Sequence, residues 1–160
     1  MNPARSNDTD EQAWMAEALA QAALALEHDD VPVGAIVVRL STGEIVARAH
    51  NARERAHDPT AHAEVLALRA AAAGAGTWHL DDHALVVTLE PCPMCAGAAW
   101  AARIPVVVFG AADPKAGATG SLYNFAVDPR LNHQTRVVAG VRAAECGELL
   151  TTFFRSRRTP

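Results

Sequence analysis

Residues 84–102 read ALVVTLEPCPMCAGAAWAA, and this stretch decides the fold class. Its first six residues form a continuous apolar run rich in β-branched side chains, which predicts a buried strand over 84–89. Pro91 and Pro93 suit the first turn of a helix, where a missing backbone N–H costs little, so a helix is predicted from there to about Ala102. A buried strand that leads into a helix is typical of an α/β fold.

The rest of the chain continues this alternation of helices and strands. Apolar positions at helical spacing predict helices over 10–27, 61–73 (with Thr60 as N-cap) and 142–157, and a short helix within 124–132. Apolar runs at strand spacing predict strands over 35–40, 44–50, 106–109 and 135–139. Loops are expected over 51–59 and 110–121. This order predicts a three-layer α-β-α architecture around a mixed five-stranded sheet that opens with an antiparallel hairpin. We expect one domain over 1–160, with 1–9 flexible and 155–160 a basic tail.

The composition of the chain limits the classes of function that the protein can have. The chain has 160 residues, of which 50% are hydrophobic and 20% charged, which is ordinary for one globular domain. The net charge of −4 excludes a protein that is basic over its whole surface, so any contact with nucleic acid needs a local patch. No apolar run approaches the ~18 residues that would cross a membrane. Two of the three cysteines form a C-x-x-C, which favours a reducing compartment and predicts a cytoplasmic protein.

Two short motifs carry the chemistry. His62-Ala63-Glu64 lies in the first half of the chain, and Cys92 and Cys95 frame the later C-x-x-C. One imidazole and two thiolates are good zinc ligands, and three protein ligands leave the fourth tetrahedral position open for water, as in catalytic sites. We therefore predict His62, Cys92 and Cys95 as ligands of one zinc ion per subunit. Glu64 is not needed as a ligand and is predicted to be the catalytic proton carrier.

The spacing of these residues predicts where the metal lies. Positions i and i+2 on a helix do not face each other, so His62 and Glu64 can serve one metal only at the first turn of a helix. The same holds for Cys92 and Cys95 at the start of the next helix. Two helix N-termini are therefore expected to converge on one zinc, where their dipoles stabilise thiolates.

H-x-E followed by P-C-x-x-C is the signature of zinc nucleobase deaminases. Beyond this motif, the chain resembles bacterial tRNA-specific adenosine deaminases from about Trp14 to Arg158. The matching stretches are Val31-Pro32-Val33-Gly34-Ala35, His57 to Glu64, Val87 to Cys92, Met94 to Ala98, Phe109-Gly110-Ala111, Asp113 with Lys115, Gly117-Ala118, Gly120-Ser121-Leu122, and Phe153-Phe154-Arg155-x-Arg157-Arg158.

The resemblance implies an activity and a set of contacts. It implies a cytidine deaminase-like fold and zinc-dependent hydrolytic deamination of the wobble adenosine to inosine in a tRNA anticodon loop, with ammonia released. It also implies a homodimer with a tRNA anticodon stem-loop as its partner. The residues expected to bind the substrate are Asn51 at the base, Asp113 at the ribose, and Lys115, Arg155 and Arg157 at the RNA backbone. Phe154 is expected to stack on an unpaired base.

Other interpretations remain open at this point. A free-nucleobase or nucleotide deaminase, of the guanine or cytosine type, would share the zinc motif. A non-enzymatic zinc-binding domain would close the fourth position with protein, and Cys146 could complete such a Cys₃His site. Asn51 could form an Asx-turn, Phe153 and Phe154 could be core residues of the last helix, and the C-x-x-C alone would also fit a redox pair.

Overall fold

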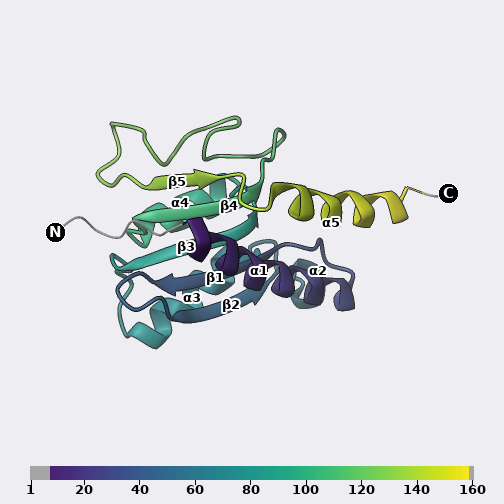
Figure 1. The fold of residues 1–160 in the computed structure, drawn as a ribbon, viewed down its shortest axis with the longest axis horizontal. Helices are drawn as coiled ribbons and strands as arrows, with labels where there is room; N and C mark the ends of the chain where they lie inside the picture. The colour runs from purple at the N-terminus through teal and green to yellow at the C-terminus, as the bar shows by residue number, and fades with distance from the viewer. Residues whose placement is uncertain (1–7, 159–160) are drawn as a thin grey trace.

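A five-stranded sheet forms the centre of the protein (Figure 1), whose computed structural model describes residues 8–158. Its strands are β1 Gly34–Arg39, β2 Ile45–His50, β3 His83–Leu89, β4 Val106–Ala111 and β5 Arg136–Ala139, in the spatial order β2-β1-β3-β4-β5. β1 pairs antiparallel with β2 and with β3, whereas β3 with β4 and β4 with β5 pair parallel. The predicted mixed five-stranded sheet with an opening hairpin is therefore confirmed.

Helices cover both faces of this sheet. They are α1 Asp8–Ala25 with the 3₁₀ turn η1 Leu26–His28, α2 Arg53–Ala56, α3 Ala63–Ala75, α4 Pro93–Ala101 and α5 Ala143–Ser156. Successive strand side chains alternate between faces. Val37 accordingly joins the apolar cluster under α3 and α4, whereas its neighbour Val38 joins the cluster under α1 and α5. The three predicted layers are present.

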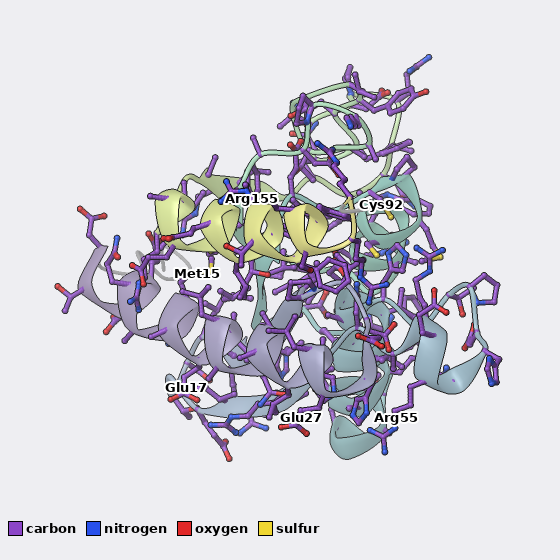
Figure 2. All side chains as sticks on the ribbon, turned by 90° about the vertical axis from the view of Figure 1, so that its right-hand side faces the viewer. Met15, Glu17, Glu27, Arg55, Cys92 and Arg155 are labelled. Atoms are coloured by element: carbon purple, nitrogen blue, oxygen red, sulfur yellow. The ribbon has the colours of Figure 1, made fainter. Side chains whose placement is uncertain are left out.

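The direction of the strands decides where the loops meet. Because β1 is antiparallel to β2 and β3, the strands β2, β3, β4 and β5 all run the same way. Their carboxyl ends share one edge of the sheet, which faces the viewer in Figure 2, with Cys92 labelled on it. Asn51 follows β2, Glu90 follows β3 and Asp113 lies just beyond β4. Residues far apart in the sequence therefore meet at this edge.

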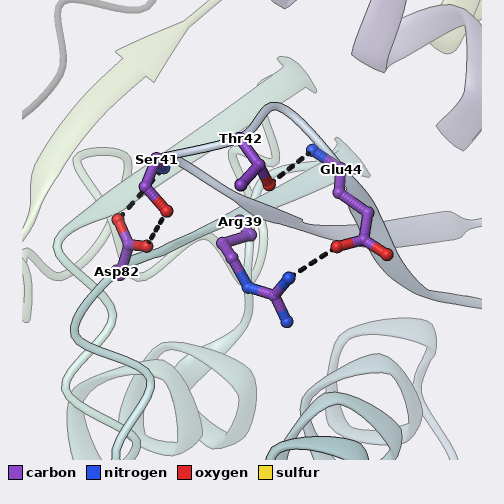
Figure 3. Close-up of polar contacts among 5 residues, drawn as sticks. All are labelled: Arg39, Ser41, Thr42, Glu44 and Asp82. Atoms are coloured by element: carbon purple, nitrogen blue, oxygen red, sulfur yellow. Dashed lines mark hydrogen bonds and ion pairs between the residues drawn. The ribbon is translucent and has the colours of Figure 1, made fainter.

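At the opposite edge of the sheet, polar contacts surround the β1–β2 turn (Figure 3). Arg39 donates a hydrogen bond to the Glu44 carboxylate at 2.5 Å across the turn. The backbone N–H of Ser41 donates to Oδ1 of Asp82 at 3.2 Å, which ties the turn to the residue before β3. These exposed contacts link the two strands of the hairpin to each other and the turn to the start of β3.

Three local predictions were wrong. Thr60 does not cap α3, because its N–H and hydroxyl both bond Asp58 and the helix begins only at Ala63. Residues 51–59 are not all loop, since they contain α2. The expected short helix within 124–132 is a series of turns. There, Pro129 has no N–H, and Asp128 accepts a hydrogen bond from the Arg130 N–H at 3.0 Å, which favours a turn over a helix.

Two expectations concern the chain ends. The flexible segment 1–9 falls outside the described residues except for Asp8 and Thr9, which lie in α1. Of the basic tail, Arg155 belongs to the last turn of α5, Arg157 and Arg158 follow it, and 159–160 are outside the described part. Within 8–158, no helix combines the length and apolar character that crossing a membrane requires.

Candidate metal centre and active site

Three side chains with metal-ligand chemistry converge at the carboxyl edge of the sheet. Nδ1 of His62 lies 3.6 Å from Sγ of Cys92 and 3.4 Å from Sγ of Cys95. One ligand atom from each residue lies within 4.8 Å of the other two, the spacing that a single ion requires. Among the described residues, this is the group of histidine, cysteine and carboxylate side chains that could hold a metal. An imidazole with two sulfurs fits zinc.

The three side chains come from the starts of two helices, as the spacing of the motifs predicted. His62 is the N-cap of α3 and Cys92 the N-cap of α4, both with extended backbone. Pro93 occupies the first turn of α4, where its fixed φ suits the helix. Cys95 lies in the same first turn, which places it beside Cys92. Both positive helix ends therefore point at the site and stabilise thiolates.

Asn51 connects the sheet to this arrangement. Its side chain is buried, and its Oδ1 accepts a hydrogen bond at 2.9 Å from the backbone N–H of Ala63, the first residue of α3. Asn51 thus satisfies an N–H at the helix start, a role that the sequence suggested for Thr60. The bond fixes α3, and with it His62, to the end of β2. Because the oxygen is engaged, the amide nitrogen is the group left to donate to a ligand.

Glu64 lies beside the metal ligands and is nearly inaccessible, with 4% of its surface exposed. Burial raises the pKa of its carboxyl to about 7, whereas hydrogen bonding to its backbone and the charge of His62 act in the opposite direction. A carboxyl that exchanges its proton near neutral pH is suited to both take and give protons.

The two thiols of the site behave differently. A hydrogen bond with Cys95 lowers the pKa of Cys92 to about 4, with His62 contributing in the same direction. The same bond, together with burial and the nearby Glu64, raises the pKa of Cys95. Cys92 is therefore the thiolate that attracts a cation. Zinc binding requires both sulfurs as thiolates, so it releases the proton of Cys95.

Cys146 does not belong to this centre. It is buried in α5, in the apolar cluster under α1 and α5 on the other side of the sheet from α3 and α4. A Cβ added to Gly110 would lie 2.3 Å from its sulfur, so the thiol fills the space left by that glycine. The described residues therefore give no support to a closed Cys₃His site. Cys146 is a small core residue, as free buried cysteines commonly are.

Asp113 and Lys115 lie in the loop after β4, and their side chains differ in role. Oδ1 of Asp113 accepts hydrogen bonds from the N–H groups of Lys115 and Ala116, at 3.0 and 3.2 Å, which makes Asp113 a turn former. The Lys115 side chain is exposed. Glu90 holds this loop through hydrogen bonds. Sequence reasoning missed this residue, although it directly precedes the metal-ligand motif.

Glu90 is 2% exposed and accepts hydrogen bonds from loop N–H groups, including those of Asp113 and Ser121, both at 2.9 Å. Burial alone would raise the pKa of its carboxyl, but the hydrogen bonds from Ser121, Asp113 and Thr119 outweigh burial and lower the pKa. The carboxylate therefore stays ionised at neutral pH and ties the loop to the residues before Cys92.

Cavities along α5 bring together some of the predicted substrate residues. A cavity of about 190 Å³ is lined by Asn51, Arg53, Phe154 and Arg157, among others. Arg155 lines a separate cavity of about 350 Å³ with Phe154 and Arg158. Phe154, with 44% of its surface exposed, borders both cavities. The structure thus brings Asn51, Phe154 and Arg157 together and places Arg155 on another side of α5.

Arg157 and Phe153 have structural contacts of their own. Arg157 forms an ion pair with Asp29 at 3.2 Å and donates a hydrogen bond to its carbonyl at 2.9 Å. Its guanidinium lies 4.3 Å from the centre of the Phe153 ring. Phe153 is a core residue, with 8% of its surface exposed. These contacts fasten the end of α5 to the turn after η1.

Known proteins match this chain closely. Residues 8–111 match the family described as the cytidine and deoxycytidylate deaminase zinc-binding region. The chain is 49% identical to the tRNA-specific adenosine deaminase of Bacillus subtilis over 94% of its own length and 92% of that protein. A solved tRNA:A34 deaminase is similar with a TM-score of 0.82 and 40% identity, covering 86% of this chain and 99% of the other.

The guanine deaminase of Nitrosomonas europaea has the same fold at greater distance, with a TM-score of 0.75 and 25% identity over 89% of this chain and 83% of that one. The match to tRNA-specific deaminases extends over nearly the whole chain, including the segments outside the metal site. The chain therefore belongs to the zinc-dependent cytidine and deoxycytidylate deaminase family and, within it, to the tRNA-specific adenosine deaminases.

Proposed function

We propose that this protein deaminates the wobble adenosine of a tRNA anticodon loop to inosine, with water consumed and ammonia released. The observation that carries the proposal is the convergence of His62, Cys92 and Cys95 beside the buried Glu64, in a chain 49% identical to a tRNA-specific adenosine deaminase. The family's tRNA substrate is extended to this chain on the basis of that similarity.

The chemistry follows from the positions of the side chains. His62, Cys92 and Cys95 would hold zinc, which lowers the pKa of a water molecule enough to supply a nucleophile at neutral pH. Glu64 takes the proton as oxygen adds to the ring carbon that bears the amino group. It gives that proton to the neighbouring ring nitrogen, then takes the second proton from the new hydroxyl group and passes it to the departing amine, so that ammonia leaves and a carbonyl forms. The amide nitrogen of Asn51 would orient the base by donating a hydrogen bond.

The surface that would bind RNA lies around α5 and the loop after β4. Phe154 offers an exposed ring for stacking, and Lys115 and Arg155 are exposed positive charges that form no ion pair with another residue of 8–158. Asp113 would approach the ribose. Arg157 already pairs with Asp29 and Phe153, so we assign it mainly to anchoring the helix end and only secondarily to the RNA backbone.

Replacing Arg155 and Arg158 with alanine is expected to weaken stem-loop binding by about tenfold and to reduce the salt dependence of binding by about two phosphate contacts. Both side chains are exposed, and neither forms an ion pair within 8–158. Fluorescence anisotropy at several salt concentrations measures the effect. The double variant Arg39→Ala, Arg48→Ala removes the same formal charge elsewhere and should bind normally. An unchanged affinity of the first variant would remove these arginines from the interface.

A side-by-side assay tests the function itself. Zinc-loaded protein is given an adenosine-bearing anticodon stem-loop, free adenosine, adenine, guanine or cytidine. Inosine formed only in the stem-loop is the expected result. Ammonia released from guanine instead would favour the second candidate, a free-base deaminase, which the similarity to the Nitrosomonas europaea guanine deaminase makes the natural alternative.

We further propose that the whole chain forms one deaminase domain that works as a homodimer in the cytoplasm. The dimer is supported by the family and by apolar side chains left more than half exposed on the loop before β5, namely Leu122, Tyr123 and Val127. Sedimentation velocity of the zinc-loaded protein tests this, and a monomer at working concentration would reject the dimer.

A further inference from the structure

Glu90 occupies the junction between the metal-ligand segment and the loop after β4. It directly follows β3, and its backbone N–H bonds the carbonyl of Ala111 at the end of β4 at 2.8 Å. The next residue, Pro91, accepts a hydrogen bond from the Ala118 N–H at 2.8 Å. Cys92 follows. The backbone on either side of the carboxylate is thus shared between the metal site and the loop.

The Glu90 side chain is the centre around which this loop folds. Its Oε2 accepts hydrogen bonds from the Asp113 N–H and the Ser121 hydroxyl, at 2.9 and 2.5 Å. Its Oε1 accepts from the N–H groups of Ser121 and Thr119, at 2.9 and 3.3 Å. Four donors from both ends of the loop therefore converge on one carboxylate. The two ends of the loop are also linked through Gly117, whose N–H donates to the carbonyl of Asp113 and whose carbonyl accepts from the N–H of Leu122, so the carboxylate adds a second connection between them.

Gly117 shows how tightly the loop lies on this group. A Cβ at that position would be 2.3 Å from both the carboxyl carbon and Oε2 of Glu90, closer than real contacts allow. The backbone between Lys115 and Thr119 therefore lies directly against the carboxylate. Lys115 lies two residues before Gly117, and its N–H donates to Oδ1 of Asp113 at 3.0 Å, so the turn formed by Asp113 leads directly into this close contact.

We propose that Glu90 is a positioning residue that fixes the loop 113–121 against the metal-ligand segment and thereby sets the affinity for the RNA substrate. This inference rests on the proposed function, because it takes Asp113 and Lys115 as RNA contacts. In the proposed arrangement, Glu90 itself contacts neither the substrate nor the metal. It acts by holding the loop in the conformation that presents those two residues beside the site.

The Glu90→Gln variant tests the arrangement with little change in size. A glutamine has one acceptor oxygen where the carboxylate has two, so its NH₂ group must replace one of them. At the position of Oε1 the NH₂ would face two backbone N–H groups. At the position of Oε2 it faces the Ser121 hydroxyl, which can rotate to accept, and the N–H of Asp113, which cannot. The favoured orientation therefore releases the N–H of Asp113.

The expected result is a loss of affinity without a loss of chemistry. The Kd and KM for the stem-loop rise by about tenfold, since the partly buried N–H of Asp113 loses a charged acceptor, while kcat changes by less than about twofold. Bound zinc remains one equivalent per chain. Hydrogen exchange, measured without RNA, becomes faster for peptides covering 112–122 and stays unchanged for α3.

Ser121→Ala and Glu44→Gln complete the experiment. Ser121→Ala removes one donor from the same carboxylate and should raise Kd by about threefold. Its effect in the Glu90→Gln background should differ from its effect in the wild-type protein, because the hydroxyl and the side chain at position 90 contact each other and their effects are not additive. Glu44→Gln makes the same chemical change on the β1–β2 turn and should leave Kd and exchange at wild-type values.

The outcomes separate this inference from the proposed function. A wild-type Kd, a kcat effect at unchanged KM, zinc loss in proportion to activity, or unchanged exchange of the loop would each overturn the role of Glu90. Failure of the wild-type protein to deaminate the stem-loop would instead reject the proposed function, and the Kd and exchange comparison would still decide whether Glu90 controls the loop. A wild-type protein that does not bind the stem-loop would reject both.

Discussion

Replacement of Glu64 with glutamine is expected to lower kcat on the stem-loop by about two to four orders of magnitude, the contribution typical of a well-placed proton carrier. Glutamine keeps the size and hydrogen-bonding shape of the side chain but cannot take a proton at neutral pH. Since Glu64 is buried beside the site and the sulfurs and imidazole form the metal group, zinc content should remain at one equivalent. KM should change little.

The measurement is a single-turnover assay on protein whose zinc content is known from atomic emission. Glu44→Gln provides the control, because it removes a carboxylate that is 60% exposed and far from the metal ligands. Wild-type turnover in the Glu64 variant would show that another group moves the protons. Loss of zinc with the loss of turnover would mean that the carboxylate supports the metal rather than the reaction.

The sequence predicted the parts of the site that depend on chemistry and local geometry. The meeting of His62, Cys92 and Cys95 was predicted from their ligand chemistry, and the two converging helix N-termini from the fact that positions i and i+2 cannot face one metal along a helix. The strands were predicted because buried β-branched runs are a strong signal. Each of these inferences uses residues that are neighbours in the chain.

The remaining features depend on contacts between distant segments. The helix α2 was missed because it has four residues and is held by the Asp30 carboxylate, which accepts hydrogen bonds from the N–H groups of Glu54 and Arg55. Asn51 accepts a hydrogen bond from the start of α3, which lies beyond α2 in the sequence. Glu90 accepts hydrogen bonds from donors more than twenty residues away. A carboxylate that organises a loop looks, in a sequence, like any other charged residue before a turn.

Cys92→Ala is expected to lose zinc and to reduce turnover by about three orders of magnitude or more, because only two protein ligands remain and the activation of water is lost. The fold should survive this change. Cys92 lies at the start of α4, outside both apolar clusters, which are built from the sheet and the helices that cover it. The melting temperature should fall toward that of the wild-type protein stripped of zinc, since the variant loses only the stabilisation that metal binding gives.

Cys146→Ala is the matched control, because it makes the same chemical change at a buried cysteine on the other side of the sheet. It should keep one zinc and near-normal turnover, with a modest loss of stability from the space opened beside Gly110. Zinc per chain and thermal unfolding, measured on both variants, decide between two kinds of centre. Loss of zinc from Cys146→Ala would restore the closed Cys₃His interpretation. Loss from Cys92→Ala alone places the metal where three ligands leave one position open, as hydrolysis requires.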